Sequence, residues 1–391
     1  MKNTVTQGFI RSFSEKPQYI FSAPGRTELG GNHTDHQHGV VLAAAVNLKT
    51  YAAVRINGTD TINVVSEGYA PVSVPLSDLE VHAEQYGSTV SLIRGVAAAF
   101  AARGCALSGF DAYIASAVPA GSGLSSSAAF EVLIGTVINT LFFSSALSPV
   151  EIAQIGQWAE NVYFGKPCGL MDQTACSVGG VIGIDFRDPE KPVVRKAELD
   201  LGKAGYALCI IDCGADHAAL TGEYAAITEE LGAVCAVFGK KVLREVDENE
   251  FYARIADVRR AAGDRAVLRA MHVFEENRRA EAEFEALQAG DFDSFLGLVG
   301  ESGRSSWLWL QNVLPAGATE HQDMAFALAL AEKLLSGRGA VRVHGGGFAG
   351  TIQAFVPLCA LAAFRAEIER VLGAGSCHVL SFSPVGGTAE E

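Results

Sequence analysis

The spacing of apolar and polar residues in the first half of the chain predicts a mixture of strands and helices. Apolar runs or strict alternation, bounded by turn residues, predict strands at residues 19–25, 40–46, 50–56, 61–66, 110–118 and 180–186. Apolar residues at helical spacing predict helices at residues 89–103, 128–143 and 149–164. Residues 1–65 are therefore expected to contain strands and turns, with a polar, glycine-rich loop at residues 25–39.

The second half repeats this mixture after a polar stretch. Residues 188–205 contain Asp-Pro-Glu-Lys-Pro and lose the apolar pattern, so we place a domain boundary near residue 200. Beyond it, the pattern predicts helices at residues 218–238, 248–262, 264–289 and 292–309 and a further helix ending at residue 372. Strands are predicted at residues 206–213 and 377–383, and a strand–loop–strand at residues 340–357. The prediction is an α+β protein with two domains, residues 1–200 and 201–391.

Composition excludes several classes of protein. The 391-residue chain is 49% hydrophobic and 19% charged, which supplies a core and excludes a disordered protein. Its net charge of −14 argues against nucleic acid or an anionic membrane as a partner. The eight cysteines form no C-x-x-C pair, and no signal peptide or membrane span of ~20 apolar residues is found. We therefore expect a cytoplasmic protein with reduced thiols, and a monomer, although the sequence does not determine the oligomeric state.

The segment Pro119-Ala-Gly-Ser-Gly-Leu-Ser-Ser-Ser-Ala-Ala carries the first chemical signal. It joins a predicted strand to a predicted helix, whose first N–H groups are unpaired and partly positive. Small residues let phosphate oxygens reach these groups, although an ordinary capped turn is the simpler alternative. No Lys-Ser/Thr pair follows the glycines, so this is not a Walker A loop. The expected phosphate contacts are Gly121, Ser122, Gly123, Leu124, Ser125, Ser126 and Ser127.

A second polar loop gathers an unusual number of charged and hydrogen-bonding residues. Within residues 24–39 lie Arg26, Glu28, Asn32, Asp35 and three histidines. A polyol ligand needs this mixture of donors and acceptors, whereas the alternative is an ordinary Asn/Gly turn. A transition-metal site is also conceivable, but the spacing matches no standard metal motif. Its ligands would be His33, Asp35, His36 and His38.

Two further segments are ambiguous by themselves. Residues 345–350 match G-x-G-x-x-G, which would suggest a dinucleotide-dependent oxidoreductase, but the residues that follow predict a strand rather than the required helix. Asp172 lies in Gly-Leu-Met-Asp-Gln, twelve positions after Glu160. Alone, Asp172 would be interpreted as a helix cap and Glu160 as part of a solvated face.

Taken in order, these segments resemble the galactokinases of the GHMP small-molecule kinase superfamily. The blocks that carry the resemblance are the signature at residues 26–39, the phosphate loop at 119–129, the acidic block at 160–173, Tyr224, His272-x-x-x-Glu276-Asn277 and the glycine motif at 342–350. They span about residues 18–385. The resemblance implies a two-domain GHMP kinase fold, with an S5-domain-2-like N-terminal domain, a ferredoxin-like C-terminal domain and an active site in the cleft between them.

The resemblance also implies a reaction and a set of site residues. The reaction is phosphorylation of the anomeric hydroxyl of galactose, with ATP as co-substrate and Mg²⁺ as cofactor. Asp172 is then the base or orienter of the attacking hydroxyl and Arg26 its cationic partner, while Ser127 and Glu160 match metal ligands. The expected sugar contacts are Asn32, His33, Asp35, Gly169 and Tyr224, and the C-terminal glycine loop is formed by Gly345, Gly346 and Gly347.

The chain departs from the usual signature at two places. Where that signature reads Gly-Glu-His-Thr-Asp-Tyr, this chain has Gly-Asn-His-Thr-Asp-His at residues 31–36, and the usual Val-Asn-Leu is Thr-Glu-Leu at residues 27–29. The resemblance implies that the missing glutamate contacts the C6 hydroxyl, so Asn32 is expected there. The alternatives are a kinase for galacturonate or an amino sugar, and a non-catalytic sugar sensor. Retention of Asp172, Arg26, Ser127 and Glu160 argues against the sensor.

Overall fold

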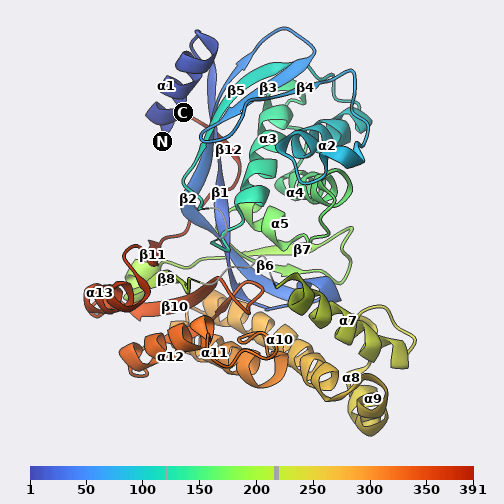
Figure 1. The fold of residues 1–391 in the computed structure, drawn as a ribbon, viewed down its shortest axis with the longest axis vertical. Helices are drawn as coiled ribbons and strands as arrows, with labels where there is room; N and C mark the ends of the chain where they lie inside the picture. Colours follow the sequence, from blue (N-terminus) through green and yellow to red (C-terminus); the bar gives the residue numbers. More distant parts are fainter. Residues whose placement is uncertain (120–121, 215–219) are drawn as a thin grey trace.

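Two β-sheets divide the protein into two halves in a computed structural model that describes residues 1–119, 122–214 and 220–391 (Figure 1). The eight-stranded sheet contains β1 (Tyr19–Gly30), β2 (Val40–Ile56), β3 (Thr61–Ser66), β4 (Val72–Pro75), β5 (Phe110–Ser116), β6 (Val181–Asp185), β7 (Val193–Ala197) and β12 (Thr388–Glu390). The four-stranded sheet contains β8 (Tyr206–Asp212), β9 (Ala340–His344), β10 (Thr351–Pro357) and β11 (Cys377–Leu380).

Helices cover both faces of each sheet. In the N-terminal half they are α1 (Lys2–Phe13), α2 (Thr89–Ala102), α3 (Ser126–Phe142), α4 (Pro149–Trp158) and α5 (Met171–Val178). A short α6 (Leu201–Ala204) precedes β8. The C-terminal half contains α7 (Thr221–Val237), α8 (Glu248–Ala253), α9 (Ile255–Ala262), α10 (Asp264–Gln288), α11 (Phe292–Ser305), α12 (Asp323–Leu335) and α13 (Leu361–Leu372).

The alternation of side chains along the strands places the helices of the N-terminal half on opposite faces of its sheet. Ala52 and Val54 of β2 pack toward the core formed with α2, α3 and α4. Ala53, which lies between them, packs with Val5 and Phe9 of α1. Successive side chains of a strand point to opposite faces, so this alternation follows from the period of two. Strand β1 shifts register between Pro24 and Arg26 and again between Glu28 and Gly30, where the chain turns toward the second half.

The smaller sheet has the antiparallel order β11-β8-β10-β9. One face packs against α12 and α13, and the other packs against α10 and α11. The apolar core between this sheet and helices α10 and α11 also includes Leu29, Leu42 and Leu124 from the N-terminal half, so the two halves share apolar packing. Strand β12 returns to pair with β1, and the chain termini therefore lie close together (Figure 1).

Several predicted elements require correction. Residues 1–65 contain a helix, α1, in addition to strands, because Val5 and Phe9 are four residues apart and bury one face against the sheet. Helices α5 and α12 form where no helix was expected, and the predicted helix at residues 248–262 is divided into α8 and α9. No helix of residues 1–119, 122–214 and 220–391 is long and apolar enough to cross a membrane. All eight cysteines are free thiols.

Candidate active site

The central pair of the candidate site is Arg26 on β1 and Asp172 in the first turn of α5. Nε and Nη2 of Arg26 donate to the two carboxylate oxygens of Asp172, each at 2.8 Å. This bidentate arrangement fixes both the distance and the plane of the pair. The Arg26 side chain is 8% exposed and the Asp172 side chain 35%, so the carboxylate is the partner that a ligand can reach.

Asp172 receives a further hydrogen bond from Ser125, whose hydroxyl donates to Oδ2 at 2.5 Å. Burial by itself raises the pKa of Asp172, but the charge of Arg26 and the hydrogen bonds outweigh it and hold the pKa below its ordinary value. The carboxylate is therefore ionised at neutral pH. It can accept a hydrogen bond from a hydroxyl group and orient that group.

The glycine- and serine-rich loop lies directly against Arg26. Nη1 of Arg26 donates to the carbonyl oxygen of Gly123, and the Arg26 backbone N–H donates to the carbonyl oxygen of Leu124 at 3.0 Å. Gly25 permits this approach, because a Cβ atom there would lie 2.6 Å from the Leu124 oxygen. The loop and the Arg26–Asp172 pair are thus held in a fixed relation.

Helix α3 starts immediately after this loop. Ser125 has a left-handed conformation with φ 59°; its hydroxyl donates to Asp172 and makes no cap hydrogen bond to the helix. The first N–H groups of α3 therefore remain open to an anion. The described members of the predicted phosphate loop are Ser122, Gly123, Leu124, Ser125, Ser126 and Ser127, whereas Gly121 lies outside the described residues.

Two buried carboxylates share a hydrogen-bond donor, the side chain of Gln173. They belong to Glu131 on α3 and to Glu160 in the π-helical turn that follows α4 (Ala159–Phe164). Nε2 of Gln173 donates to Oε2 of Glu131 at 3.0 Å and to Oε2 of Glu160 at 2.9 Å. Nζ of Lys166 lies 3.1 Å from Oε1 of Glu160, whereas Oε1 of Glu131 is buried and has no hydrogen-bond partner among the residues that the structure describes. Burial, together with the charge of Glu160, raises the pKa of Glu131 well above its ordinary value.

This donor set fits a hard divalent cation. Ser127 and Glu131 are four residues apart on α3 and so share one helix face, and Mg²⁺ prefers hydroxyl and carboxylate oxygens. A bound cation would offset the cost of ionising the buried Glu131 carboxylate. Sequence reasoning proposed Ser127 and Glu160 as metal ligands and did not consider Glu131, for which the available signal was a glutamate inside an apolar helix, one turn after Ser127.

Two of the predicted sugar contacts, Asp35 and Gly169, lie directly against each other. A Cβ atom on Gly169 would lie 2.2 Å from Oδ2 of Asp35, so only glycine fits beside this carboxylate. Asp35 belongs to a short helical turn, Asp35–Gln37, at the end of the polar loop. The loop of residues 25–39 and the start of α5 are therefore packed together at this point.

The other predicted sugar contacts hold the glycine loop between β9 and β10. The carbonyl oxygens of the three consecutive glycines in this loop each accept a hydrogen bond from one of these predicted sugar contacts. The pairs are Asn32 Nδ2 with Gly345 at 2.7 Å, His33 Nε2 with Gly346 at 2.9 Å and the Tyr224 hydroxyl with Gly347 at 2.8 Å. Residues 351–357 form strand β10 rather than a helix, so the glycine loop is not a dinucleotide fingerprint.

The histidines of the polar loop bind each other and the backbone. Gln37 Nε2 donates to His36 Nδ1 at 3.2 Å, so the proton of His36 lies on Nε2, which donates to His33 Nδ1 at 3.2 Å. Burial, followed by the proximity of His36, lowers the pKa of His33 to about 3. His33 is therefore neutral at physiological pH. Within the three described stretches, no cluster of His, Cys, Asp or Glu could hold a metal ion by itself, and the transition-metal alternative finds no support.

Buried charges lie beneath the polar loop. Arg342 on β9 forms an ion pair with Glu28 on β1, and it also donates to the carbonyl oxygen of Leu29 at 2.5 Å. Glu276 on α10 accepts hydrogen bonds from the backbone N–H groups of Gly31 at 3.3 Å and Asn32 at 3.2 Å. Sequence analysis noted the block that contains Glu276 but could not pair Glu28 with Arg342, since the partners are 314 residues apart.

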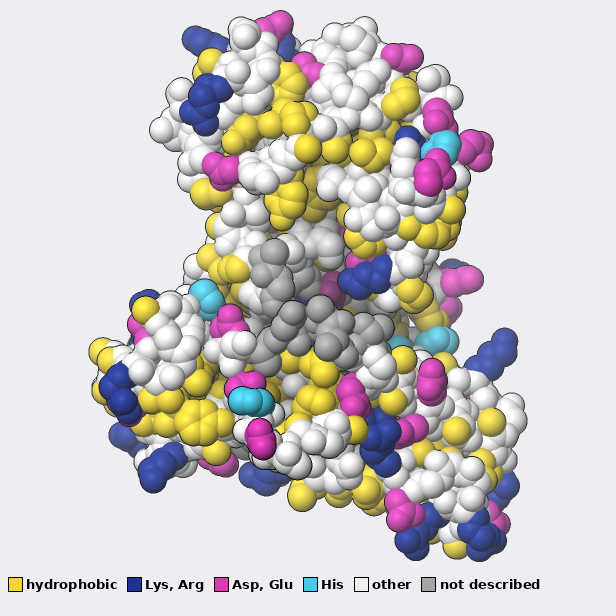
Figure 2. All heavy atoms as spheres, viewed as in Figure 1, with side chains coloured by type: hydrophobic (Ala, Val, Ile, Leu, Met, Phe, Trp, Pro, Cys, Tyr) yellow, Lys and Arg dark blue, Asp and Glu magenta, His cyan; other side chains and the backbone are white. Residues whose placement is uncertain are grey.

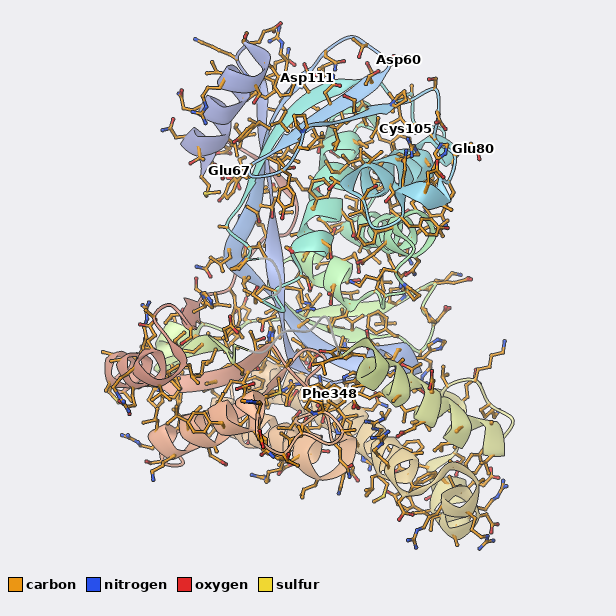
Figure 3. All side chains as sticks on the ribbon, viewed as in Figure 1. Asp60, Glu67, Glu80, Cys105, Asp111 and Phe348 are labelled. Carbon is orange, nitrogen blue, oxygen red and sulfur yellow. The ribbon has the colours of Figure 1, made fainter. Side chains whose placement is uncertain are left out.

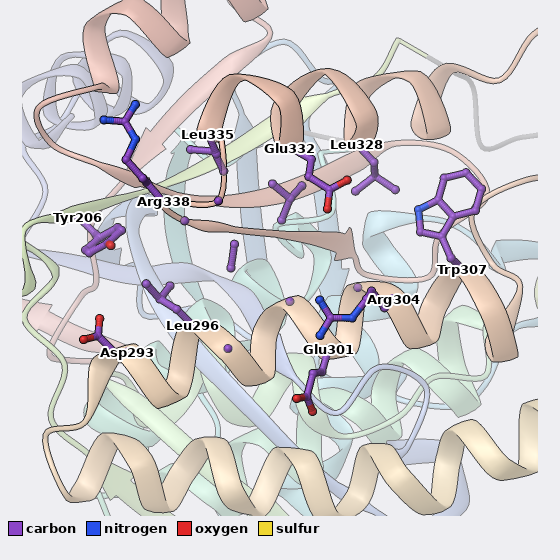
Figure 4. A pocket seen from close by; sticks show the side chains of 17 residues that line it. Tyr206, Asp293, Leu296, Glu301, Arg304, Trp307, Leu328, Glu332, Leu335 and Arg338 are labelled. Carbon is purple, nitrogen blue, oxygen red and sulfur yellow. The ribbon is translucent and has the colours of Figure 1, made fainter.

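These contacts place the candidate site where the two halves meet. The molecule narrows at this level in the space-filling view (Figure 2). Phe348, which follows the glycine loop, lies at the upper edge of the lower half, whereas Asp60, Glu67, Glu80 and Asp111 lie far from it in the upper half (Figure 3). A separate groove of about 590 Å³ is lined by α11, the π-helical turn that follows it (Ser306–Leu310), α12 and the chain before β9 (Figure 4). Its lining includes Arg304, Trp307 and Arg338 and none of the residues of the candidate site.

Comparison with known proteins gives matches over most of the chain. Residues 91–180 match the GHMP kinases N terminal domain, and residues 7–56 match the galactokinase galactose-binding signature. A galactokinase of Streptomyces coelicolor is 32% identical over 378 residues, which cover 95% of this chain and 93% of that protein. A galactokinase of Glaesserella parasuis serovar 5 is 32% identical over 372 residues, which cover 89% and 88%.

Solved structures agree with these matches. The crystal structure of Lactococcus lactis galactokinase complexed with galactose is similar with a TM-score of 0.83 and 27% identity, over 99% of each chain. Methanococcus jannaschii mevalonate kinase is similar with a TM-score of 0.65 at 14% identity, over 93% of this chain and 98% of that one, which shows the fold alone. The predicted two-domain α+β fold class is confirmed.

Proposed function

Since this chain belongs to the galactokinase family of GHMP kinases, we propose that it transfers the terminal phosphoryl group of ATP to the anomeric hydroxyl of galactose. The products are galactose 1-phosphate and ADP. The observation that carries the proposal is the Arg26–Asp172 pair, held by Ser125 at the end of a phosphate loop and within reach of a ligand. We expect the enzyme to act in the cytoplasm, where ATP is present and thiols stay reduced.

Asp172 and Arg26 are assigned different roles toward the attacking hydroxyl. In phosphoryl transfer the protein mainly positions the reacting groups and neutralises charge. The ionised Asp172 accepts a hydrogen bond from the anomeric hydroxyl and aims its oxygen at the phosphorus atom. It takes the proton late, when the bond to phosphorus makes that oxygen acidic. Arg26 holds the carboxylate in this orientation and offsets negative charge on the transferred group.

ATP and Mg²⁺ are assigned to the loop and the acidic pair. The loop of residues 122–127 and the open N–H groups of α3 would bind the phosphates of ATP. Ser127, Glu131 and Glu160 would hold Mg²⁺, which supplies neutralising charge to the β- and γ-phosphates when bound. Asp35, Gly169 and Tyr224 are proposed as sugar contacts because they lie in the same region, where the N-terminal and C-terminal halves meet.

The charges of the polar loop favour a neutral sugar over galacturonate. A C6 carboxylate needs a cationic partner, but His33 is neutral at physiological pH and supplies no positive charge. Arg342, which contacts the loop, is inaccessible and already paired with Glu28, and Arg26 of the loop itself is paired with Asp172. Galactose therefore fits the electrostatics of this region better than its C6 acid.

A panel of sugars with coupled detection of ADP tests the proposal. Galactose, galacturonate, N-acetylgalactosamine, glucose and arabinose are compared at saturating MgATP, and we expect the highest kcat/KM with galactose. Turnover of galacturonate well above that of galactose would change the sugar and leave the kinase assignment in place. Galactose binding without ADP release from any sugar would instead identify a non-catalytic sensor.

Replacement of Glu160 tests the metal assignment. Glu160→Gln keeps the shape of the side chain but removes the charge that a divalent cation requires. We expect the Mg²⁺ concentration for half-maximal rate to rise by about tenfold or more, while the KM for the sugar changes little. Titration of the rate with Mg²⁺ measures both. Glu67→Gln, at an exposed position far from the junction, is the matched control, and an unchanged Mg²⁺ requirement in Glu160→Gln would remove this residue from the metal site.

A further inference from the structure

The side chain of Asn32 forms hydrogen bonds with other residues of the protein through both its amide nitrogen and its amide oxygen. Its Nδ2 donates to Oε1 of Glu28 at 3.1 Å and to the carbonyl oxygen of Gly345 at 2.7 Å. Its Oδ1 accepts a hydrogen bond from Nδ2 of Asn312 at 2.9 Å. Asn32 is 1% exposed. An amide nitrogen has two hydrogens to donate, and both are used here, so it offers no donor to a ligand.

The backbone of Asn32 is held as firmly as its side chain. The N–H group donates to Oε1 of Glu276 at 3.2 Å, and the carbonyl oxygen accepts from Nε2 of His272 at 3.0 Å. Both partners come from α10, whereas Gly345 lies at the end of β9. Asn32 therefore connects the polar loop of the N-terminal half to two elements of the C-terminal half.

Glu28 supplies the acceptor that fixes the orientation of the Asn32 amide. Its Oε1 is shared between Asn32 Nδ2 and Nη2 of Arg342. Glu28 is 4% exposed and Arg342 is inaccessible, so this ion pair is shielded from water. Loss of either charge would leave the other buried without its ion-pair partner, which is unfavourable.

The amide and the carboxylate are exchanged relative to the signature that the polar loop resembles, which has Asn at the position of Glu28 and Glu at the position of Asn32. In this chain a carboxylate at position 32 would face two acceptors, the carboxylate of Glu28 and the carbonyl oxygen of Gly345. Neither can donate a hydrogen bond to it. The residues at positions 28 and 32 are therefore compatible only as a set.

We infer that Glu28 and Asn32 act as one coupled positioning pair that fastens the polar loop to the glycine loop, and that position 32 gives the C6 hydroxyl of the sugar no charged acceptor. This inference rests on the proposed function and deepens it, because it concerns how the sugar is selected. Asn32 is thereby assigned to positioning instead of the direct C6 contact that the family resemblance implies.

Reciprocal exchange of the two residues tests the coupling. The variants are Asn32→Glu, Glu28→Asn and the double exchange, and each is compared with the wild type by kcat/KM for galactose at saturating MgATP. We expect each single variant to lose about tenfold or more, and the double variant to regain at least about tenfold over the weaker single variant. Recovery is expected because Arg342 contacts the same carboxylate oxygen that Asn32 reaches, so a carboxylate at position 32 can replace the missing one. The coupling would be overturned if the fold-losses in kcat/KM of the two single variants simply multiply in the double variant, or if Asn32→Glu is fully active.

Comparison of galactose with 6-deoxygalactose tests the consequence for specificity at C6, first in the wild type and then in the double exchange. A site that hydrogen-bonds a substrate hydroxyl rejects the analogue lacking it by about 10⁴-fold or more, whereas a site without that bond discriminates by about 100-fold or less. We expect wild-type kcat/KM for 6-deoxygalactose to lie within about 100-fold of that for galactose, and the ratio to widen in the double exchange. A wild-type ratio near 10⁴ would contradict the inference.

Thermal unfolding separates failure of this inference from failure of the proposed function. The contacts of Glu28 and Asn32 exist without ligand, so the unfolding midpoints of the four proteins should show the same coupling in the absence of sugar. Coupled midpoints in a protein that does not phosphorylate galactose would reject the function and retain the pair. An active galactokinase with uncoupled midpoints and uncoupled kinetics would reject the pair alone.

Discussion

Replacement of Asp172 by asparagine is expected to abolish sugar-dependent release of ADP. The amide keeps the size of the side chain but replaces one acceptor oxygen by a donor, and it cannot take the proton of the anomeric hydroxyl. Loss of this group should lower kcat by about 10²-fold or more. Arg26 would also lose the carboxylate that it binds at two points. Initial rates at saturating galactose and MgATP measure the effect.

The affinity of the Asp172→Asn variant for MgATP serves as an internal control. A nucleotide titration should show little change in affinity for MgATP, because Asp172 is assigned to the sugar hydroxyl and the phosphates to the loop at residues 122–127. Asp60→Asn is the matched variant, at an exposed position far from the junction (Figure 3), and should retain full activity. Activity of Asp172→Asn within a few-fold of the wild type would transfer the orienting role to another residue.

Replacement of Arg26 by lysine is expected to have the second-largest effect. The guanidinium group uses Nε and Nη2 on Asp172 and Nη1 on the carbonyl oxygen of Gly123. An ammonium group cannot reproduce this planar set of donors, so both the carboxylate and the loop lose their fixed position. We expect kcat to fall by about 10²-fold, measured under the same saturating conditions.

The pH dependence of Arg26→Lys provides a second readout. Burial raises the pKa of Asp172 and Arg26 lowers it, with the lowering dominant. A weaker partner therefore lets the pKa rise toward its ordinary value, and the acid limb of the kcat profile should move to higher pH. Arg338→Lys, an exposed position on the separate groove of Figure 4, should leave both kcat and the profile unchanged. An acid limb that stays in place would contradict the electrostatic role of Arg26.

Local sequence patterns were sufficient for the parts of the fold whose determinants are close together in the chain. Helix α3 and the strand after the glycine loop form as predicted, because each has continuous apolar spacing and small or polar residues at its start. Helix α12 was not predicted, although its buried residues Met324, Leu328, Ala331 and Leu335 recur at helical spacing. The signal was present there, but its outer face is also largely apolar, which weakens the periodic contrast.

The order of the motifs, rather than any single loop, identified the family and its reaction. Each block by itself had a simpler explanation as a turn, a cap or a solvated face. The blocks occur in one order over nearly the whole chain, and the comparisons confirm the family. The individual roles of Asp172, Arg26, Ser127 and Glu160 remain predictions, which the experiments above test.

Only the tertiary structure decided which polar groups are partners. The sequence by itself determined which residue types are available to the site: an arginine, an aspartate, a serine-rich loop and a signature with Asn32 in place of glutamate. It could not show that Asn32 is committed to Glu28 and Gly345, or that Glu131 lies beside Glu160. A buried polar group must find a partner wherever the chain brings one, and these partners are separated by up to hundreds of residues. Secondary structure follows from local spacing, whereas the pairing of buried charges depends on how the two halves pack.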